Sequence, residues 1–268
     1  MSGGRLITAR RLGALYFGVV VFYLIFPILI ILPISFSNND FLRFPPSNFG
    51  LRWYRDYLSD PVWIDATILS FQVAALVAVI ATVTGTLAVL ALARGRPRFG
   101  RAISGFIALP IVIPHIFIAL GVFIFAVRFG WEDNMFVLAG AHSAIALPFV
   151  VLIVGASHRQ LDPALEQAAR VLGAGPVRAF FSAAFPSLLP AIVAGAVFAF
   201  FVSFDELIIA QFLMSRNETL PMRIWADLRL ELRPTLAAVA SLLIVVTTLA
   251  LAGAELLRRR AQAKLDQR

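Results

Sequence analysis

Two adjacent carboxylates lie inside a long apolar run toward the C-terminal end of the chain. Asp205 and Glu206 interrupt the segment FVSFDELIIA, residues 201–210, within a run that extends over 188–213. An ionisable side chain at the centre of a membrane helix costs at least ~2.5–3.5 kcal/mol on insertion scales. Two such groups require a cation, a hydrogen-bond network or a water-filled path as compensation. No Lys or Arg lies inside the other apolar runs, which favours a path or an exogenous cation.

The residues around these carboxylates indicate how a cationic solute would be bound. On one continuous helix adjacent side chains point about 100° apart, so Asp205 is predicted to lie on an aromatic face and Glu206 on a face of small residues. We interpret the two acids as the anionic lining of a substrate pathway, with Ser203 beside them and cation–π attraction from Phe201 and Phe204. The alternative is structural: both carboxyls are protonated or hydrogen-bonded, or they lie at the edge of an outer vestibule.

Composition places these residues in a membrane protein. Hydrophobic residues make up 60% of the 268 residues, whereas soluble domains contain about 45–50%. Six apolar runs are long enough for a membrane helix, which needs about 20 residues, and the alternating strands of a membrane barrel are absent. The first run is too long for a secretory signal, whose apolar region has about 7–15 residues, and is predicted to remain as a helix. The predicted spans are 12–35, 64–92, 103–127, 136–157, 187–213 and 236–257.

The positive charge of the chain indicates its orientation. The net charge is +8, and most Lys and Arg fall on one side of the predicted spans, in 1–11, 93–102, 158–186 and 258–268. The segments on the opposite side contain fewer cations, mixed with acids. By the positive-inside rule the basic side, with both termini, is cytoplasmic. The charge therefore reflects membrane topology and contact with anionic lipid rather than a nucleic-acid surface.

Two further features of the spans bear on a pathway. Pro110 and Pro114 in LPIVIPHIF are predicted to bend or break the third span, because each removes a helical hydrogen-bond donor. His115 lies in this bend, and His142 lies near the start of the fourth span. Each His is interpreted either as a buried, hydrogen-bonded structural group or as a contact that lines a pathway. Neither has a second His at metal-ligand spacing, so no metal site is predicted.

The segment 158–186, between the fourth and fifth spans, is longer than a simple helix connection of about 2–8 residues. Its sequence, HRQLDPALEQAARVLGAGPVRAFFSAAFP, predicts two short helices. Asp162 is suited to cap the first helix, and Gly173 and Gly175 supply a turn before the second. One face of the first helix is apolar and consists of Leu165, Ala168, Ala169 and Leu172. This face is suited either to dock a partner protein or to lie on the inner leaflet.

The same segment resembles the EAA loop of ABC-importer permeases. The family pattern is Glu-Ala-Ala, three residues, Gly, nine residues and then Ile-x-Leu-Pro, and QAARVLG followed by AAFP fits this spacing without a gap. Gln167 occupies the glutamate position of the pattern, with Glu166 one residue earlier, while Ala183 replaces the isoleucine and Phe185 the leucine. The resemblance implies a coupling helix that seats in a groove of a cytoplasmic ATPase. The residues assigned to this coupling are Asp162, Glu166, Gln167, Ala168, Ala169, Arg170, Gly173 and Pro186.

The chain itself lacks the residues needed to hydrolyse ATP. A Walker A loop requires the lysine of GxxxxGK[ST], and Lys264 in the tail is the only lysine of the chain. We therefore predict that the chain is not an enzyme, binds no cofactor, and depends on a partner ATPase that uses ATP. No Cys is present, so disulfide and thiolate chemistry are excluded as well.

A second resemblance concerns the solute. The stretch FVSFDELIIAQFL and the later TLPMRIWADLRLELRPTLAAVASLLI look like the fifth and sixth spans of spermidine/putrescine-type ABC permeases. Residues 203–206 occupy the Ser-Phe-Asp-acidic stretch of that branch, and residues 219–221 occupy its Thr-Leu-Pro turn. Polyamines are small polycations, which agrees with the two carboxylates. The same branch also includes permeases for other small solutes.

Together the resemblances imply an all-α protein of the bacterial inner membrane with six transmembrane helices and the type I ABC importer permease fold. The predicted parts are an N-terminal helix with an outer segment over 1–62, a permease core over 63–257 and a basic tail over 258–268. The expected partners are a cytoplasmic ABC ATPase dimer, a second permease subunit, an extracytoplasmic solute-binding protein and membrane lipid. One rival is an ion-coupled secondary transporter, although no inverted repeat is visible. Another is a membrane scaffold, which leaves the carboxylates and the proline bend unexplained.

Overall fold

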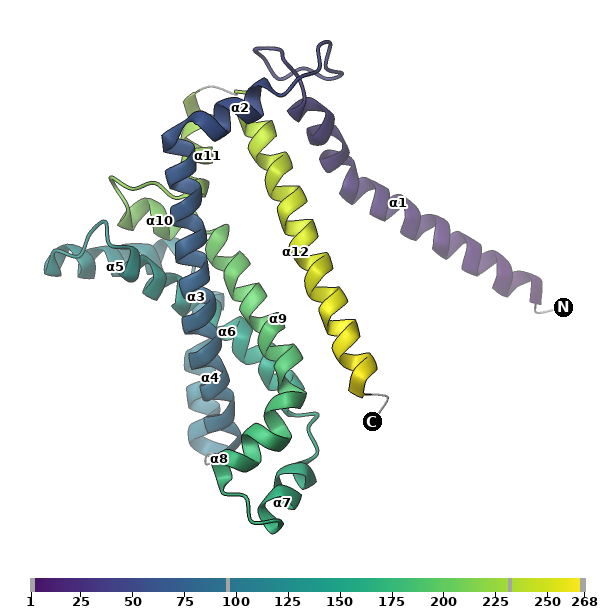
Figure 1. Ribbon diagram of the computed structural model, residues 1–268, viewed down its shortest axis with the longest axis vertical. Helices are drawn as coiled ribbons and strands as arrows, with labels where there is room; N and C mark the ends of the chain where they lie inside the picture. Colours follow the sequence, from purple (N-terminus) through teal and green to yellow (C-terminus); the bar gives the residue numbers. More distant parts are fainter. Residues whose placement is uncertain (1–2, 95–96, 231–232, 266–268) are drawn as a thin grey trace. The chain divides into compact units, whose positions relative to one another are not determined.

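The computed structural model of the chain describes residues 3–94, 97–230 and 233–265. Within these ranges the backbone is helical or irregular, apart from a single β-bridge between Ser37 and Phe49. The helices, labelled in Figure 1, are α1 Gly3–Ser35, α2 Arg52–Ser59, α3 Pro61–Arg94, α4 Pro97–Val112, α5 His115–Phe129, α6 Met135–His158, α7 Pro163–Val171, α8 Pro176–Ala179, the π-helix η1 Phe180–Ala184, α9 Phe185–Phe204, α10 Ile208–Leu213, α11 Leu220–Leu230 and α12 Thr235–Leu265. The predicted all-α class is confirmed for these residues.

The chain divides into two compact units, and the larger one covers 62–223. Within it α6 packs against α9, α4 and α10. α6 begins after Asn134, whose Oδ1 accepts a hydrogen bond from the backbone N–H of Phe136 at 2.8 Å. This contact satisfies one of the amides that a helix start leaves without an acceptor. The side chains of α6 that form the core of the unit are Leu138, Ala139, Ala141, Ile145, Ala146, Val150 and Val154.

Two glycines allow neighbouring helices to approach α6 closely. A Cβ atom on Gly85 of α3 would lie only 2.7 Å from Cγ1 of Val150, closer than real Cβ contacts. A Cβ atom on Gly195 of α9 would lie 3.4 Å from the same Cγ1 atom. Small residues at helix interfaces permit this kind of close packing between membrane helices. Val150 is fully buried as a result.

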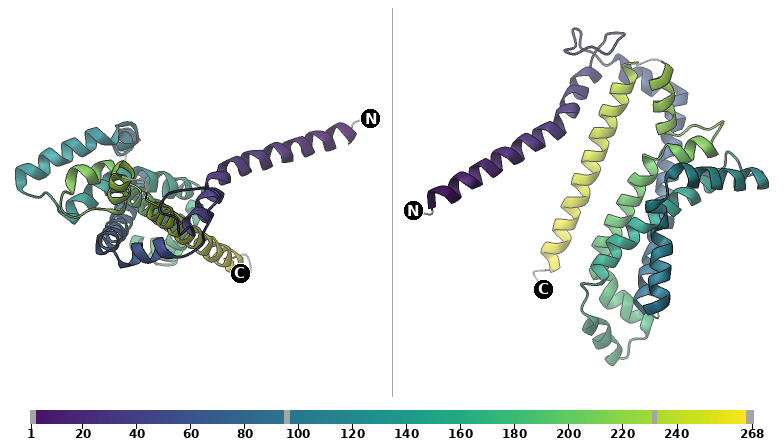
Figure 2. Two further views of the ribbon diagram at one scale, coloured as in Figure 1. Left: turned by 90° about the horizontal axis from the view of Figure 1, so that it is seen from above. Right: turned by 180° about the vertical axis from the view of Figure 1, so that it is seen from behind.

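α4 and α5 are the two halves of a sharply bent pair. Pro110 lies inside α4, Pro114 immediately precedes α5, and the two helices are bent by 101° relative to each other. Figure 2 shows α5 turning away from the direction of α4. Proline has no backbone N–H, and its ring clashes with the preceding helical turn. The predicted break is confirmed, and His115 is the first residue of α5.

The prediction of one continuous helix over 187–213 is wrong. α9 ends at Phe204, and α10 begins only at Ile208. In a continuous helix the N–H groups of Ile209 and Ala210 would donate to carbonyls four residues earlier, but here both donate to the side chain of Glu206. The helical faces predicted for Asp205 and Glu206 therefore do not exist.

The connection from α6 to α9 contains two short helices, as predicted. α7 follows Asp162, whose Oδ1 accepts a hydrogen bond from the N–H of Ala164 at 2.9 Å. Gly173 follows this helix with a φ of 89°, a conformation that costs a glycine little because it has no Cβ atom. α8 follows Gly175 and continues through η1 into α9. Nothing in the sequence pattern indicated the π-helix.

The smaller unit, 1–61 together with 224–268, contains α1, α2 and α12. α12 contacts both α1 and α2. The hydroxyl of Tyr54 on α2 lies 2.7 Å from Oγ of Ser35 on α1, and it donates a hydrogen bond to Oγ of Ser241 on α12 at 3.1 Å. One hydroxyl group therefore connects α1, α2 and α12.

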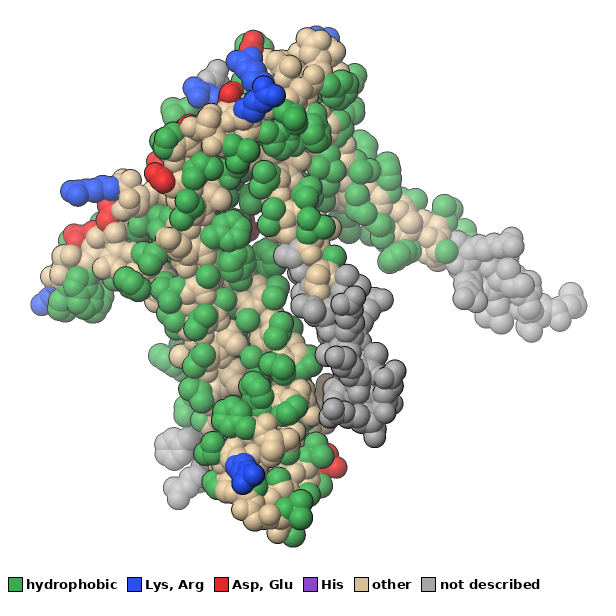
Figure 3. Space-filling view, viewed as in Figure 1, with side chains coloured by type: hydrophobic (Ala, Val, Ile, Leu, Met, Phe, Trp, Pro, Cys, Tyr) green, Lys and Arg blue, Asp and Glu red, His purple; other side chains and the backbone are tan. Residues whose placement is uncertain are grey.

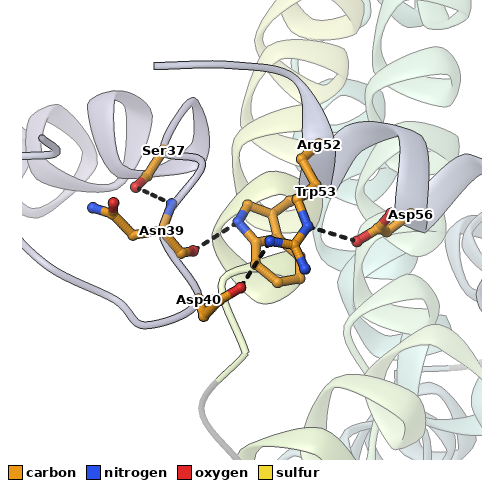
Figure 4. A network of polar contacts seen from close by, with 6 residues as sticks. All are labelled: Ser37, Asn39, Asp40, Arg52, Trp53 and Asp56. Atoms are coloured by element: carbon orange, nitrogen blue, oxygen red, sulfur yellow. Dashed lines mark hydrogen bonds and ion pairs between the residues drawn. The ribbon is translucent and has the colours of Figure 1, made fainter. Parts of the chain in front are cut away.

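A polar network holds α2 to the loop that precedes it (Figure 4). Nε1 of Trp53 donates a hydrogen bond to the carbonyl of Asn39 at 3.1 Å. The guanidinium of Arg52 forms an ion pair with Asp40 at 2.7 Å and lies 4.0 Å from the carboxylate of Asp56. The same guanidinium lies 4.6 Å from the ring centroid of Trp53, which is a cation–π arrangement.

Four described helices are long and apolar enough to cross a membrane, and the α4–α5 pair adds a fifth if it counts as one span. The described apolar part of α12, Thr235–Leu249, is shorter, so the sixth span stays a prediction. Figure 3 shows hydrophobic side chains along the helices and charged side chains near their ends. The side chains of the predicted basic tail, 258–268, lie outside the described residues. The four spans are Leu12–Ser35, Pro61–Arg94, Met135–His158 and Pro176–Phe204.

Candidate functional site

Glu206 lies where the fifth predicted span is interrupted. Its Oε2 accepts hydrogen bonds from the backbone N–H groups of Ile209 at 2.8 Å and Ala210 at 3.3 Å. Amides in the first turn of a helix have no acceptor within the helix, so the carboxylate supplies one. The side chain of Glu206 is only 4% exposed. A buried carboxylate thus stabilises the start of α10 by hydrogen bonds to its backbone.

His142 of α6 contacts the same carboxylate. Its Nε2 lies 3.5 Å from Oε2 of Glu206, an ion-pair contact rather than a hydrogen bond, and its Nδ1 lies 2.9 Å from Oγ of Ser203. Which of Nδ1 and the Ser203 hydroxyl donates this hydrogen bond depends on the tautomer of the ring. The His142 side chain is 1% exposed. It fits the structural interpretation of a buried, hydrogen-bonded histidine.

His115 contacts the other oxygen of the carboxylate. Its Nδ1 lies 3.4 Å from Oε1 of Glu206, and its side chain is 43% exposed. The structural interpretation of His115 as a buried group is therefore wrong. Its position as the first residue of α5, directly after Pro114, places it at the bend of the α4–α5 pair. The half-exposed side chain of His115 therefore contacts the buried carboxylate of Glu206.

The two helix interruptions therefore meet at one side-chain contact. α5 packs against α10, and His115 at the start of α5 faces Glu206, which lies just before α10. Neither resemblance nor spacing predicted this meeting, because His115 and Glu206 lie far apart in the sequence and in different predicted spans. The signal available in the sequence was limited to the presence of two His in the predicted spans near an intramembrane acid.

Asp205 differs from its neighbour because it is exposed. Phe204 is buried in an aromatic cluster: its ring is stacked on Phe200 with 5.6 Å between centroids and meets Phe71 edge-on at 5.0 Å. Phe201 is half-buried beside Phe200, with 5.6 Å between their ring centroids. The structure thus brings Ser203 and Glu206 together through His142. It places Phe204 among other aromatic rings.

Two charged side chains of the predicted coupling segment form a small group with an arginine of α3. Glu166 lies 3.4 Å from a guanidinium nitrogen of Arg94 at the end of α3 and 3.7 Å from one of Arg170, one helical turn later. Gln167, at the position where the family pattern has glutamate, is exposed. Glu166 therefore ties α7 to α3, while Gln167 faces outward.

Apolar residues of the coupling segment are exposed as well. Leu172, which belongs to the predicted apolar face, is 88% exposed, and Leu165 and Ala168 are also exposed, whereas Ala169 is half-buried. Val171 and Val177 extend this exposed apolar surface. Pro186 lies in the first turn of α9 and is exposed.

A second carboxylate joins two loops of the larger unit. Asp133, between α5 and α6, has a φ of 57° and accepts hydrogen bonds from the N–H groups of Ser215, Arg216 and Asn217 and from the Ser215 hydroxyl. Partial burial alone would raise the pKa of Asp133, but the hydrogen bonds from Ser215, Asn217 and Arg216 outweigh it and hold the pKa below the ordinary value. The sequence had indicated only that acids occur in this loop.

The arrangement around Glu206 suits cation binding. In the described part of the chain no three His, Asp or Glu side chains are placed to hold a metal ion, so the cluster with His115 and His142 lacks metal-ligand geometry. The ion-pair partners of Glu206 among these residues are the two histidines. At low dielectric a carboxylate interacts with a cation more strongly than it does in water, so this carboxylate is suited to contact one.

Comparison with known proteins identifies the chain as a membrane subunit of an ABC importer. The chain belongs to the family of binding-protein-dependent transport system inner membrane components, whose model matches residues 81–263. It is 31% identical over 230 residues to the putrescine transport system permease protein PotI of Escherichia coli K12. This alignment covers 83% of this chain and 82% of PotI. It is 29% identical over 243 residues to the spermidine/putrescine permease PotC of Haemophilus influenzae, which covers 90% of this chain and 94% of PotC.

Solved structures share the fold at low sequence identity. A chain of a bacterial ABC transporter that imports the acidic polysaccharide alginate superposes with a TM-score of 0.72 at 16% identity, over 95% of this chain and 98% of that one. A chain of an amino acid ABC transporter superposes with a TM-score of 0.58 at 19% identity, over 78% of this chain and 98% of that one. The predicted permease family, importer fold and inner-membrane location are confirmed, and the family decides against an ion-coupled secondary transporter.

Proposed function

We propose that this chain is the permease subunit of an ATP-driven importer and forms part of the path for a small polycation of the polyamine class. The family assignment supports transport, and the names of the similar proteins PotI and PotC support a polyamine. The observation that carries the choice of a cation is the carboxylate of Glu206, which is buried between two interrupted helices with His rather than Lys or Arg as ion-pair partners.

We also propose six membrane helices with both termini in the cytoplasm. In this topology the connection 158–186 lies in the cytoplasm and the loops around Asp133 and Ser215 lie outside. The distribution of Lys and Arg supports it. α7 would then present Gln167 and Leu172, both exposed, to the compartment that contains ATP. The loops joined by Asp133 would face the compartment that contains the solute-binding protein.

The family of the chain supports a set of partners. Two ATPase subunits lie on the cytoplasmic side of the permease pair, and one of them binds α7 and α8 of this chain. ATP is bound and hydrolysed by these partners, and this chain binds no cofactor. A second permease chain completes the pathway, and an extracytoplasmic binding protein delivers the solute. Closure of the ATPases moves α7, and a rigid-body change of the helices alternates access to the path.

Another small solute is the alternative, and one comparison favours keeping it. The chain is 26% identical over 253 residues to a permease of Salmonella typhimurium named for putative 2-aminoethylphosphonate transport, with 85% of this chain covered. That compound carries an amine but also an anionic phosphonate group. A path lined by the carboxylate of Glu206 favours a solute without the anionic group.

Uptake into liposomes distinguishes these solutes. The assembly of both permeases and the ATPase is reconstituted with ATP inside, and uptake of radiolabelled putrescine is measured after addition of the binding protein. We expect ATP-dependent uptake that unlabelled spermidine inhibits and 2-aminoethylphosphonate does not. Inhibition by the phosphonate alone, or uptake that follows an ion gradient without ATP, would refute the proposed function.

A further inference from the structure

We propose that the imidazole of His115 occupies the place on Glu206 that an ammonium group of the solute takes during transport. The solute displaces His115 from Oε1, and His115 returns when the solute moves on. This proposal rests on the proposed function and deepens it, because it names the protein atom that the solute contacts and the residue that the solute must move.

The two oxygens of Glu206 have different surroundings. Oε2 accepts hydrogen bonds from the N–H groups of Ile209 and Ala210 and also faces His142. In the described part of the chain the contact of Oε1 is with Nδ1 of His115 at 3.4 Å. Charge-assisted hydrogen bonds between nitrogen and carboxylate are shorter, about 2.7–2.9 Å. Oε2 is therefore fixed by the fold, whereas Oε1 makes one long contact.

Burial shows the side from which Oε1 is reached. The Glu206 side chain is 4% exposed, and the His115 side chain that contacts it is 43% exposed. His142, which faces the other oxygen, is 1% exposed. An approaching cation therefore meets the imidazole of His115 before it meets the carboxylate.

The position of His115 allows the ring to move. It is the first residue of α5 and follows Pro114 at the break after α4, so rotation of its side chain disturbs no helix interior. The contact with Glu206 is the one polar contact of this side chain within the described ranges. Displacement of the ring therefore breaks a single long contact.

The chemistry of the exchange favours an amine over the imidazole. An alkylammonium group has three N–H donors and a full positive charge, so it can form a shorter bond to Oε1 than the imidazole does at 3.4 Å. Conduction also requires that the solute leaves again, so the site must not bind it too tightly. A competing imidazole on a fixed helix end limits the residence time of the ammonium group.

Chemical labelling of histidine tests the displacement. Diethylpyrocarbonate is applied to the complete reconstituted assembly, and modification of His115 and His158 is measured separately by peptide mass spectrometry. Putrescine should accelerate labelling of His115 several-fold and leave His158 unchanged, while 1,4-butanediol, which has the same carbon chain without charge, should have no effect. The acceleration should disappear in Glu206→Gln, because the ring is then no longer held by a carboxylate.

Kinetics supply an independent readout. His115→Lys places a tethered ammonium group beside Oε1, so it should raise the KM for putrescine several-fold with a smaller change in kcat. The matched variant His158→Lys should leave both unchanged. If the wild-type assembly shows no ATP-driven putrescine uptake, the proposed function fails and this proposal with it. If it transports putrescine with unchanged His115 labelling, or if His115→Lys has the wild-type KM, this proposal alone is overturned.

Discussion

Two neighbouring acids have different surroundings in this protein. Glu206 is buried, and its carboxylate contacts the backbone of α10 and two histidines. Asp205 is exposed at the end of α9. We therefore propose that the cationic path depends on Glu206, whereas the chain sequence alone gave both acids equal weight.

The substitution Glu206→Gln should lower the rate of polyamine uptake about ten-fold or more, because hydrogen bonds to a charged group contribute roughly 1.5–3 kcal/mol and the path also loses its negative charge. Asp205→Asn is the matched control, since it makes the same chemical change one residue earlier, on an exposed side chain. Uptake is compared at equal amounts of permease in the membrane. An equal loss of uptake in both variants would contradict the assignment to Glu206.

Residue types and spacing predicted the presence of an intramembrane acid and a histidine at a proline bend, but they could not predict how these groups pair. Pro110 and Pro114 act on their own helix, so their effect is readable from the sequence. The contacts of Glu206 with His115 and His142 depend on how three distant segments pack. The same limit applies to Asp133, whose partners lie in a loop more than eighty positions later.

At the scale of elements, the segment 158–186 was the part best predicted from the sequence. Its cap at Asp162 and its turn at Gly173 are local features that depend on neighbouring residues. The interruption between α9 and α10 was missed because a side chain, Glu206, replaces backbone carbonyls as the acceptor of two amides. Hydrophobicity alone cannot reveal such a replacement, since 187–213 is apolar on both sides of it.

Gly173 and Gly175, both in the segment 158–186, provide a matched test of the turn between α7 and α8. A Cβ atom at Gly173 or Gly175 would meet nothing within 4 Å, but Gly173 has a φ of 89° and Gly175 a φ of −63°. Left-handed backbone costs a residue with a side chain roughly 1–2 kcal/mol. Gly173→Val should therefore reduce ATP-driven uptake and co-purification of the ATPase, and Gly175→Val should leave both nearly unchanged. Equal behaviour of the two variants would count against a role for the turn geometry.

The loop contact of Asp133 predicts a dependence on pH. Its pKa is lower in the folded protein than the ordinary value, so the contact stabilises the fold above the unfolded pKa of ~3.9 and is lost as pH falls through the lower folded pKa. Asp133→Asn keeps a residue type that tolerates positive φ. The unfolding temperature of the wild type in nanodiscs should exceed that of the variant at neutral pH, and the difference should shrink below pH ~4. A difference that is constant with pH would exclude the ionised carboxylate as its source.

At the scale of the whole molecule, the proposed orientation makes the termini inaccessible from outside. Epitope tags at either end should be protected from protease added to intact spheroplasts, because the basic segments remain in the cytoplasm. A protease site inserted after Ser47, an exposed residue of the connection between α1 and α2, should be cut under the same conditions. Cleavage of a terminal tag in unbroken spheroplasts would reverse the topology.

The central claim is that an ATPase-driven permease carries a polycation past Glu206, between α5 and α10. Cryo-electron microscopy of the complete assembly with putrescine in the path tests it most directly. The account predicts an ammonium group within hydrogen-bond distance of Oε1 of Glu206, with His115 rotated away and a nucleotide-binding subunit seated on α7 and α8. Solute density remote from Glu206, or α7 immersed in lipid without an ATPase against it, would contradict the account.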